Sequence, residues 1–312
     1  MLSRVADSLY WMSRYLERTD GILRMLKINY ASSQDQDDIQ DFSWKPVLRT
    51  FTYLDDAEAN PIAHHSRAVL QYMVTDKENV NSVLNIITRA RENARSVQDH
   101  ITKELWQCLN DFYHMIREEQ LVRGIQKDDP VTILDILIKQ GLLYYGITDI
   151  TMSRGEGYAF MNIGKFLERG VQSLDILDVK FMDLNYDFTK TDTTYWKYLL
   201  LSISGYELYL KTYRSGFDAK NVIEQVVLNQ DFPRSVIYSV NQLHRYFERL
   251  KSEGNKDAYR KIDFMIGRIK SKVNYSTVDS IMRQGLHAYL HSVKEDLSEV
   301  GNAFNQEYFA YT

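Results

Sequence analysis

Tyr15-Leu16-Glu17-Arg18, near the start of the chain, returns 151 positions later as Phe166-Leu167-Glu168-Arg169. An apolar ladder keeps the same offset around both strings. Its members, first copy and then second, are Leu9, Met12, Leu16, Leu23 and Leu26, and Phe160, Ile163, Leu167, Leu174 and Leu177. Steps of three, four and seven residues place such side chains on one face of an α-helix. The pattern therefore predicts two related helices, near residues 2–29 and 149–178.

A polar face accompanies the ladder of the first helix. At about 100° per residue, the residues opposite the ladder are Arg4, Asp7, Trp11, Arg14 and Arg18. Glu17 and Glu168 instead fall beside their ladders. We therefore expect both carboxylates to be buried and to accept hydrogen bonds from arginine, Trp or Tyr side chains, or from backbone donors, of another helix. The alternative is that Glu and Arg form solvated pairs, as on any bundle helix, worth about a few tenths of a kcal/mol.

A weaker third copy occurs near residues 233–251. Arg245-Tyr246-Phe247-Glu248-Arg249 keeps the register of the first two strings. Val236, Val240, Leu243 and Phe247 fall on the apolar positions, and the copy stops at Gly254. We interpret it as a partial repeat.

Composition narrows the class of protein. The 312 residues suffice for one large or two smaller domains, and we expect a single helical domain over residues 1–312. A net charge of −4 argues against a general nucleic-acid binder. The single cysteine, Cys108, excludes an internal disulfide and favours a reducing compartment. We find no apolar run of membrane-spanning length and no signal peptide, and we expect a cytoplasmic, soluble protein with no membrane partner.

The chain is predicted to be all-α, a multi-helix bundle built around a long central helix. Only four prolines are present and no Asn-Gly or Asp-Gly hairpin series, so a sheet has little support. The central helix is expected from a capping box at Thr75 to about Glu119. We expect the repeat helices to lie against each other or symmetrically about it. The remaining helices are predicted near residues 44–54, 62–73, 130–145, 195–214, 218–228 and 233–251, with two more after residue 256.

The predicted central helix carries a second charged motif. Arg91-Glu92-Asn93-Ala94-Arg95 is followed by Asp99. Arg91, Arg95 and Asp99 are spaced by one turn each, so in a continuous helix they share a face.

With these strings in place the chain resembles the bacterial alpha-E domain family, all-helical proteins with paired Glu-Arg motifs. The strings that carry the resemblance are MLSRVADSLYWMSRYLER (1–18), RARENARSVQDHITKELWQCLN (89–110), TMSRGEGYAFMNIGKFLERG (151–170), WKYLLLSISGYELY (196–209) and DFPRSV (231–236). The family is encoded beside, or fused to, ATP-grasp peptide or amide ligases. The resemblance therefore implies a part in a peptide-ligation system and an ATP-grasp ligase as partner.

Known catalytic templates are missing from the sequence. It contains no phosphate-binding loop, no dinucleotide fingerprint, no nucleophile elbow and no HExxH zinc motif. Cys108 lies among the apolar residues of a helix, as expected for an inert buried thiol. His287, His291 and Glu295 have one-turn spacing, a pattern common by chance in helices. We therefore predict no catalytic residue, no metal and no cofactor.

The stronger signal is a set of arginines, carboxylates and one Trp inside the family strings. We expect this set to form a binding site or a buried polar network: Arg4, Trp11, Arg14, Glu17, Arg18, Arg91, Glu92, Arg95, Asp99, Arg154, Glu168, Arg169 and Arg234. In a network the carboxylates are paired between packed helices. In a binding site the arginines present forked donors to a peptide or an anionic small molecule.

Three functional hypotheses follow, the first of them implied by the family resemblance together with the missing catalytic templates. The leading hypothesis is a non-catalytic helical partner or substrate-binding component of an ATP-dependent peptide or amide ligase. The second is an enzyme of unfamiliar design in which the Arg and Glu residues assist aminoacyl or peptide transfer. The third is a structural scaffold.

Overall fold

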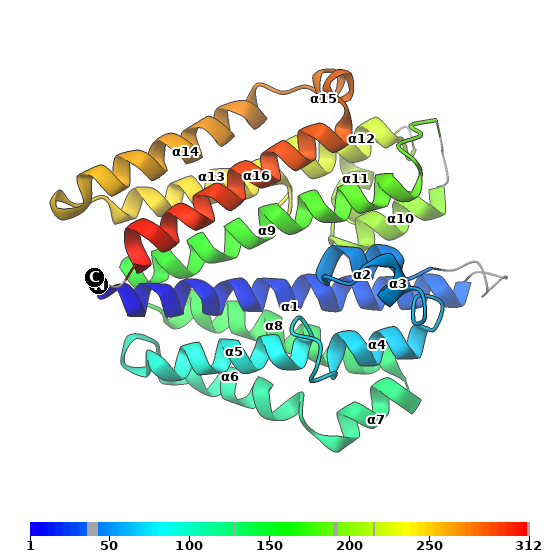
Figure 1. The fold of residues 1–312 in the computed structure, drawn as a ribbon, viewed down its shortest axis with the longest axis horizontal. Helices are drawn as coiled ribbons and strands as arrows, with labels where there is room; N and C mark the ends of the chain where they lie inside the picture. The colour runs from blue at the N-terminus through cyan, green and yellow to red at the C-terminus, as the bar shows by residue number, and fades with distance from the viewer. Residues whose placement is uncertain (36–42, 128, 190–192, 215, 311–312) are drawn as a thin grey trace. The chain divides into compact units, whose positions relative to one another are not determined.

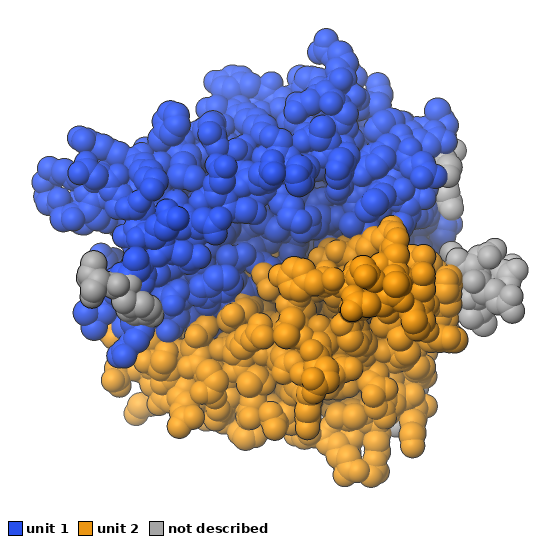
Figure 2. Space-filling model, viewed as in Figure 1, with its two compact units in different colours: residues 1–14, 153–312 blue, residues 15–152 orange. Residues whose placement is uncertain are grey.

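The computed structural model describes residues 1–35, 43–127, 129–189, 193–214 and 216–310, and these residues confirm the all-α class. They form helices joined by turns, and no strand occurs among them (Figure 1). By packing, the chain divides into two compact units (Figure 2). Unit 1 comprises residues 1–14 and 153–312, and unit 2 comprises residues 15–152. Helix α1 (Ser3–Asp35) contributes residues to both units. The expectation of a single domain over residues 1–312 stays a prediction.

Unit 2 continues from α1 through seven further helices within its described residues. They are α2 (Lys45–Phe51), α3 (Asp56–Ala59), α4 (Ser66–Val74), α5 (Val83–Ser96), α6 (Lys103–Met115), α7 (Glu119–Lys127) and α8 (Pro130–Thr151). A 3₁₀ turn, Gln98–His100, separates α5 from α6. Within this unit α5 packs against α6, and α6 also packs against α8.

Unit 1 is organised around the long helix α9 (Glu156–Asp183), against which α13 (Val236–Phe247) and α16 (Leu286–Phe304) pack. Its other helices are α10 (Thr193–Ser202), α11 (Tyr206–Thr212), α12 (Ala219–Ile223), α14 (Lys256–Asn274) and α15 (Val278–Gln284). A single π-turn follows α12 at Glu224–Leu228, and another follows α16 at Asn305–Phe309. Short 3₁₀ turns lie at Glu248–Leu250 and Glu253–Asn255.

Both apolar ladders face the protein interior, as the sequence predicts. All ten ladder side chains are at most 4% exposed. In unit 1, the first turns of α1 lie directly against α9. A Cβ atom on Gly164 would lie 2.3 Å from the carbonyl oxygen of Tyr10, a distance that no side chain tolerates. The part of α1 that belongs to unit 1 therefore contacts α9, which is one of the two predicted arrangements, and the duplication of these helices stays a prediction.

The predicted central helix over residues 75–119 is wrong. Thr75 ends α4 and does not start a helix, and α5 begins eight residues later, at Val83. The hydroxyl of Ser82, just before it, accepts the N–H of Asn85. The chain then breaks at Val97, and Thr102 caps α6 by accepting the N–H of Leu105. Each segment begins with its own side-chain cap, and the break allows α5 and α6 to pack on each other.

Other boundaries also differ from the prediction. The expected helix over residues 195–214 is two helices, because Ser204 adopts a left-handed conformation with φ of 55° after α10. The helix expected to end near Tyr145 continues to Thr151, and the second repeat helix therefore starts at Glu156 instead of residue 149. These changes shift helix ends and leave the helical class unchanged.

Helix α8 corrects the expectation that no apolar run reaches membrane-spanning length. Among the described residues it is the one helix long and apolar enough to cross a membrane by length and composition. Its exposed apolar side chains are Ile136, Leu142, Leu143 and Ile150. A core helix of a soluble protein passes the same test, so length and composition alone are weak evidence for a membrane span.

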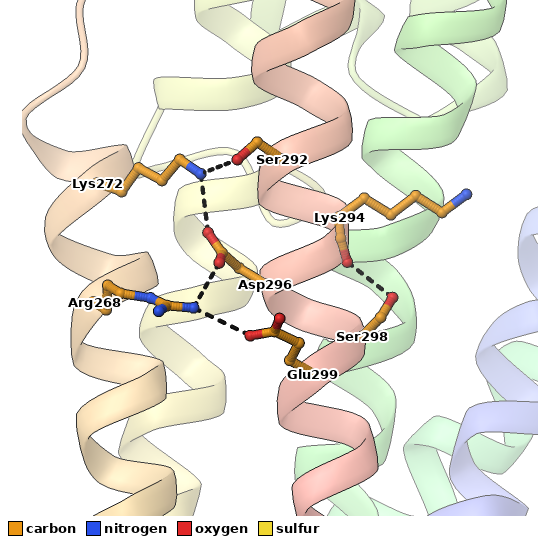
Figure 3. A network of polar contacts seen from close by, with 7 residues as sticks. All are labelled: Arg268, Lys272, Ser292, Lys294, Asp296, Ser298 and Glu299. Atoms are coloured by element: carbon orange, nitrogen blue, oxygen red, sulfur yellow. Dashed lines mark hydrogen bonds and ion pairs between the residues drawn. The ribbon is translucent and has the colours of Figure 1, made fainter.

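Charged side chains fasten α14 to α16 on the surface of unit 1 (Figure 3). Arg268 contacts Asp296 at 2.7 Å and Glu299 at 3.2 Å. Lys272 bridges Ser292 at 2.6 Å and Asp296 at 2.9 Å. These partly exposed ion pairs hold α14 against α16, so we assign them a structural role.

Candidate functional site

The carboxylate of Glu168 is buried in unit 1 and paired with Arg14. Glu168 is 3% exposed, and its Oε2 atom accepts a hydrogen bond from Nε of Arg14 at 2.9 Å and forms an ion pair with Nη2 at the same distance. Gln172, one turn along α9, donates to Oε1 at 3.5 Å. Arg14 also donates to the hydroxyl of Tyr10 at 3.2 Å. The pair thus joins the first turns of α1 to the middle of α9.

Aromatic rings enclose the Arg14 guanidinium, whose side chain is 15% exposed. Its central carbon lies 4.6 Å from the ring centroid of Trp11 and 5.5 Å from that of Tyr10. Burial alone would lower the pKa of Arg14, but Tyr10 and Glu168 together raise it above its usual value. Burial raises the pKa of Tyr10, against the opposing effect of Arg14. Arg14 is therefore held as a permanent cation.

The equivalent glutamate of the first repeat, Glu17, lies in unit 2. It is fully buried, and its Oε2 atom accepts a 2.6 Å hydrogen bond from the hydroxyl of Tyr145 in α8. One turn along α1, Asp20 is 1% exposed and accepts two hydrogen bonds from Nε of Arg24, at 2.9 and 3.0 Å. Sequence analysis missed this second pair, although its four-residue spacing is a usable signal.

The two glutamates thus confirm the expectation drawn from the helical wheel. Each is buried, and each accepts a hydrogen bond from a Tyr or Arg side chain that is distant in sequence. The arginine that follows each glutamate does not share this burial, since Arg18 and Arg169 are both half-buried. The motif therefore directs its carboxylate inward and its guanidinium toward the surface.

In unit 1, the side chain of Arg169 contacts an aromatic ring and a backbone carbonyl. Its guanidinium carbon is 5.2 Å from the ring centroid of Phe166, and Nη1 donates to the carbonyl of Pro233 at 3.2 Å. The hydroxyl of Ser173 donates to the carbonyls of Arg169 and Arg234. The segment before α13 is thereby fixed against α9.

The segment of the predicted third copy, in α13, packs against the second string, in α9. Tyr246 stacks on Phe166 with ring centroids 5.9 Å apart and an angle of 11° between the planes. Arg249 lies over Tyr246 at 5.2 Å, as Arg169 lies over Phe166. Glu248 differs from Glu17 and Glu168 because it is exposed, in the 3₁₀ turn after α13.

The motif in α5 forms a local cluster in unit 2. Arg91 is 19% exposed, and its Nε donates to Asn110 of α6 at 2.9 Å while Nη1 donates to Glu92 at 2.9 Å. Arg95 is 65% exposed and lies 3.7 Å from Glu92. The expectation that Asp99 shares their face is wrong, because α5 ends at Ser96 and Asp99 lies in the following 3₁₀ turn.

The structure therefore brings some predicted residues together and separates others. Within unit 1, Trp11, Arg14 and Glu168 form one cluster. Arg4 is exposed on the first turn of α1, and Arg154 lies over the ring of Tyr158 at 4.2 Å. Whether the set serves as a ligand site or as a structural network stays a prediction. The two partners that sequence analysis missed, Tyr10 and Tyr145, are fixed by packing between helices.

Two pockets lie apart from the predicted residues. One of about 450 Å³ lies between α6 and α8 and is lined by Lys103, Glu104, Gln107, Cys108, Asp111, Leu143 and Ile147. Burial, with a contribution from Asp111, raises the pKa of Cys108 to about 11, consistent with an inert thiol. The other, of about 400 Å³, lies beside the first π-turn and α15, with Glu224, Asn274, Thr277 and Asp279 among its lining residues.

The histidines of α16 have carboxylate partners. His287 contacts Asp178 at 2.9 Å, and His291 contacts Glu295 at 3.3 Å. Across the described ranges, no group of three or more His, Cys, Asp or Glu side chains is arranged to hold a metal ion. The one-turn spacing of His287, His291 and Glu295 thus does not produce a metal-binding group in this structure.

Comparison with known proteins places the fold and motif in a family. The model of the Alpha-E family, described as a predicted alpha-helical domain with a conserved ER motif, matches residues 1–309. The chain belongs to this family.

Similar proteins occur in mycobacteria. Uncharacterized proteins of Mycobacterium bovis and of Mycobacterium tuberculosis strain CDC 1551 are each 22% identical over 95% of this chain, and one of M. tuberculosis strain H37Rv is 21% identical. This chain spans 36% of the length of each. No solved structure matches the chain.

Proposed function

We propose that this chain is a non-catalytic helical partner or substrate-binding component of an ATP-dependent peptide or amide ligase system. The ligase as partner is what the resemblance to the alpha-E family implies, and the geometry of the Glu-Arg motif supports the non-catalytic role. Both glutamates are buried and hydrogen-bonded, while the adjacent arginines lie nearer the surface. The motif is thus suited to hold helices together and to present cations, and the class of ligand it fits is a peptide or an anionic small molecule.

A catalytic role for these carboxylates has little support. A general acid or base must come within about 3 Å of the proton it transfers, directly or through one water. Glu17 and Glu168 are 0% and 3% exposed, and each already accepts a hydrogen bond. Cys108 is buried, with a pKa raised to about 11. These three groups therefore favour the partner role over the enzyme of unfamiliar design.

The similar mycobacterial proteins are longer than this chain, which supports a role as one component of a larger system. The region that this chain matches makes up 36% of each mycobacterial protein. In those proteins the matched region is covalently joined to other segments, which is the arrangement expected of a component.

Co-expression with an ATP-grasp ligase encoded beside the gene tests the proposal. We expect the two proteins to co-purify, and ATP-dependent ligation by the ligase to rise or change in product length when this chain is added. Arg169→Gln should reduce that effect, because it removes the outward cation of the motif. Arg268→Gln, in the surface network between α14 and α16, is the matched control and should leave the effect unchanged.

Three outcomes would reject the proposal. Absence of both association and any effect on ligase products would remove the partner role. Ligation or hydrolysis by the purified chain alone, lost in Glu168→Gln with folding retained, would establish the enzyme alternative. Loss of stability in Arg169→Gln without any change in ligase activity would favour the scaffold.

A further inference from the structure

We propose that the cationic-aromatic surface of unit 1 binds an acidic peptide segment in an extended conformation. We define this surface by five cations over three rings: Arg154, Lys165, Arg169, Arg245 and Arg249, and Tyr158, Phe166 and Tyr246. The inference deepens the proposed function, on which it rests, by naming the class of peptide.

The three rings form a continuous base across α9 and α13. Phe166 stacks on Tyr246 with centroids 5.9 Å apart, and Tyr158 meets the edge of Tyr246 at 5.8 Å. Tyr158 and Phe166 are 6% and 5% exposed, and Tyr246 is half-buried. The rings therefore act mainly as a rigid support for the charges above them.

Each cation of the surface lies against one of these rings. Arg154 lies 4.2 Å from the centroid of Tyr158, and Lys165 and Arg169 lie 4.7 and 5.2 Å from that of Phe166. Arg245 and Arg249 lie 6.0 and 5.2 Å from that of Tyr246. Contact with a ring restrains the side chain of a cation, so less side-chain entropy is lost when an anion binds.

The balance of charge on these segments is positive. Three carboxylates lie on the same stretches of chain, Glu156, Glu168 and Glu248. Glu156 contacts the amino group of Met1 at 2.9 Å, and Glu168 is buried against Arg14. Glu248 is the remaining one, beside the exposed side chains of Arg245 and Arg249. Since the whole chain carries a net charge of −4, this positive surface is a local feature.

The spacing of the rings that carry the cations favours an extended peptide over a single phosphate group. A phosphate site requires several donors to converge at about 3 Å on one group. Here the cations are distributed over rings whose centres are 5.8 and 5.9 Å apart. Alternate side chains of an extended chain are about 6.6 Å apart. A run of acidic residues therefore matches the spacing of the surface.

Arg245 and Arg249 are the best residues for a test. Both are exposed, one turn apart, and each contacts Tyr246 through its own guanidinium. Their replacement by Gln removes charge and leaves the buried rings in place. The double variant Arg245→Gln/Arg249→Gln should therefore fold normally, which circular dichroism and thermal melting would verify.

The experiment measures binding of fluorescein-labelled hexaglutamate by fluorescence anisotropy, with labelled hexaglutamine as the neutral probe. We expect hexaglutamate to bind and hexaglutamine to bind at least about tenfold more weakly, since each exposed ion pair contributes modestly. The double variant should lose about tenfold in affinity, and Arg245→Lys/Arg249→Lys should lose less. Affinity should also fall between about 50 and 200 mM salt, as screening shortens the Debye length.

A matched control removes two arginines elsewhere in unit 1. Arg260→Gln/Arg283→Gln changes the net charge equally, in α14 and α15, and should change affinity less than about twofold. Equal losses in both double variants would show non-specific attraction and overturn the inference. Competition by inorganic phosphate at the concentration at which hexaglutamate competes would also overturn it, in favour of a phosphate site.

The result can be separated from the test of the proposed function. Association with the ligase without hexaglutamate binding would remove this inference alone. Hexaglutamate binding without any association or effect on a ligase would remove the proposed function and leave an acidic-peptide binder.

Discussion

Removing the carboxylate of Glu168 should destabilise the protein strongly. In Glu168→Ala, Nε and Nη2 of Arg14 lose the acceptor that each contacts at 2.9 Å. The Arg14 side chain is only 15% exposed, so water replaces the carboxylate poorly. Loss of one partner of a buried pair costs about 3–5 kcal/mol. Because Arg14 keeps its contacts with Tyr10 and Trp11, we expect the lower end, about 3 kcal/mol.

Urea denaturation followed by circular dichroism measures this loss. With an m-value of about 2 kcal/mol/M, a loss of about 3 kcal/mol shifts the midpoint by roughly 1.5 M. Glu248→Ala is the matched control, because it changes the equivalent glutamate of the third repeat at an exposed position and should cost less than about 0.5 kcal/mol.

A double variant separates the pair from its surroundings. Arg14→Met/Glu168→Leu should lose less stability than Glu168→Ala alone, because no unpaired charge remains buried. A loss below about 0.5 kcal/mol in Glu168→Ala would refute the argument, since a cost that small belongs to a solvated glutamate.

Three further predictions concern other buried groups. Tyr145→Phe removes the donor to Glu17 and should cost about 1–3 kcal/mol in urea denaturation, against Tyr275→Phe as the exposed control. Gly164→Ala should lower the melting temperature by several degrees or prevent folding, because its Cβ would lie 2.3 Å from the carbonyl of Tyr10. Burial raises the pKa of Cys108 from 9.0 to about 11. The stability gained by burying the neutral thiol is therefore fully present below pH 9 and is lost as the pH rises through 11. Native Cys108 should therefore react with a thiol reagent at pH 8 far more slowly than in urea, and equal rates would contradict its burial.

Helical periodicity predicted the parts of the fold that depend on one face of one helix. The ladders of α1 and α9, and the burial of Glu17 and Glu168, follow from positions on a wheel. The partners of the two glutamates could not be predicted in this way. Tyr145 is 128 positions from Glu17 and Arg14 is 154 from Glu168, so only the packing of helices brings them together.

The missed helix break between α5 and α6 has a different cause. Neither glycine nor proline occurs between Val97 and Thr102, and the apolar spacing continues across the break. Thr102 before Lys103 and Glu104 was a usable N-cap signal, of the same kind as the misleading capping pattern at Thr75. Local capping patterns identify where a helix can start. Contacts between α5 and α6 decide where the chain turns.

The adjacency of Glu and Arg in the family motif gains a physical meaning from this geometry. Neighbouring residues on a helix point about 100° apart, so a buried glutamate places the next side chain toward the boundary of the core. Arg169 occupies that position over Phe166, while Glu168 is closed off by Arg14. In the predicted third copy the burial of the glutamate and the arginine–ring contact do not occur together. Glu248 is exposed, while Arg249 still lies over Tyr246. The arginine-on-ring arrangement thus occurs without a buried glutamate, so the contact between arginine and ring does not depend on the carboxylate.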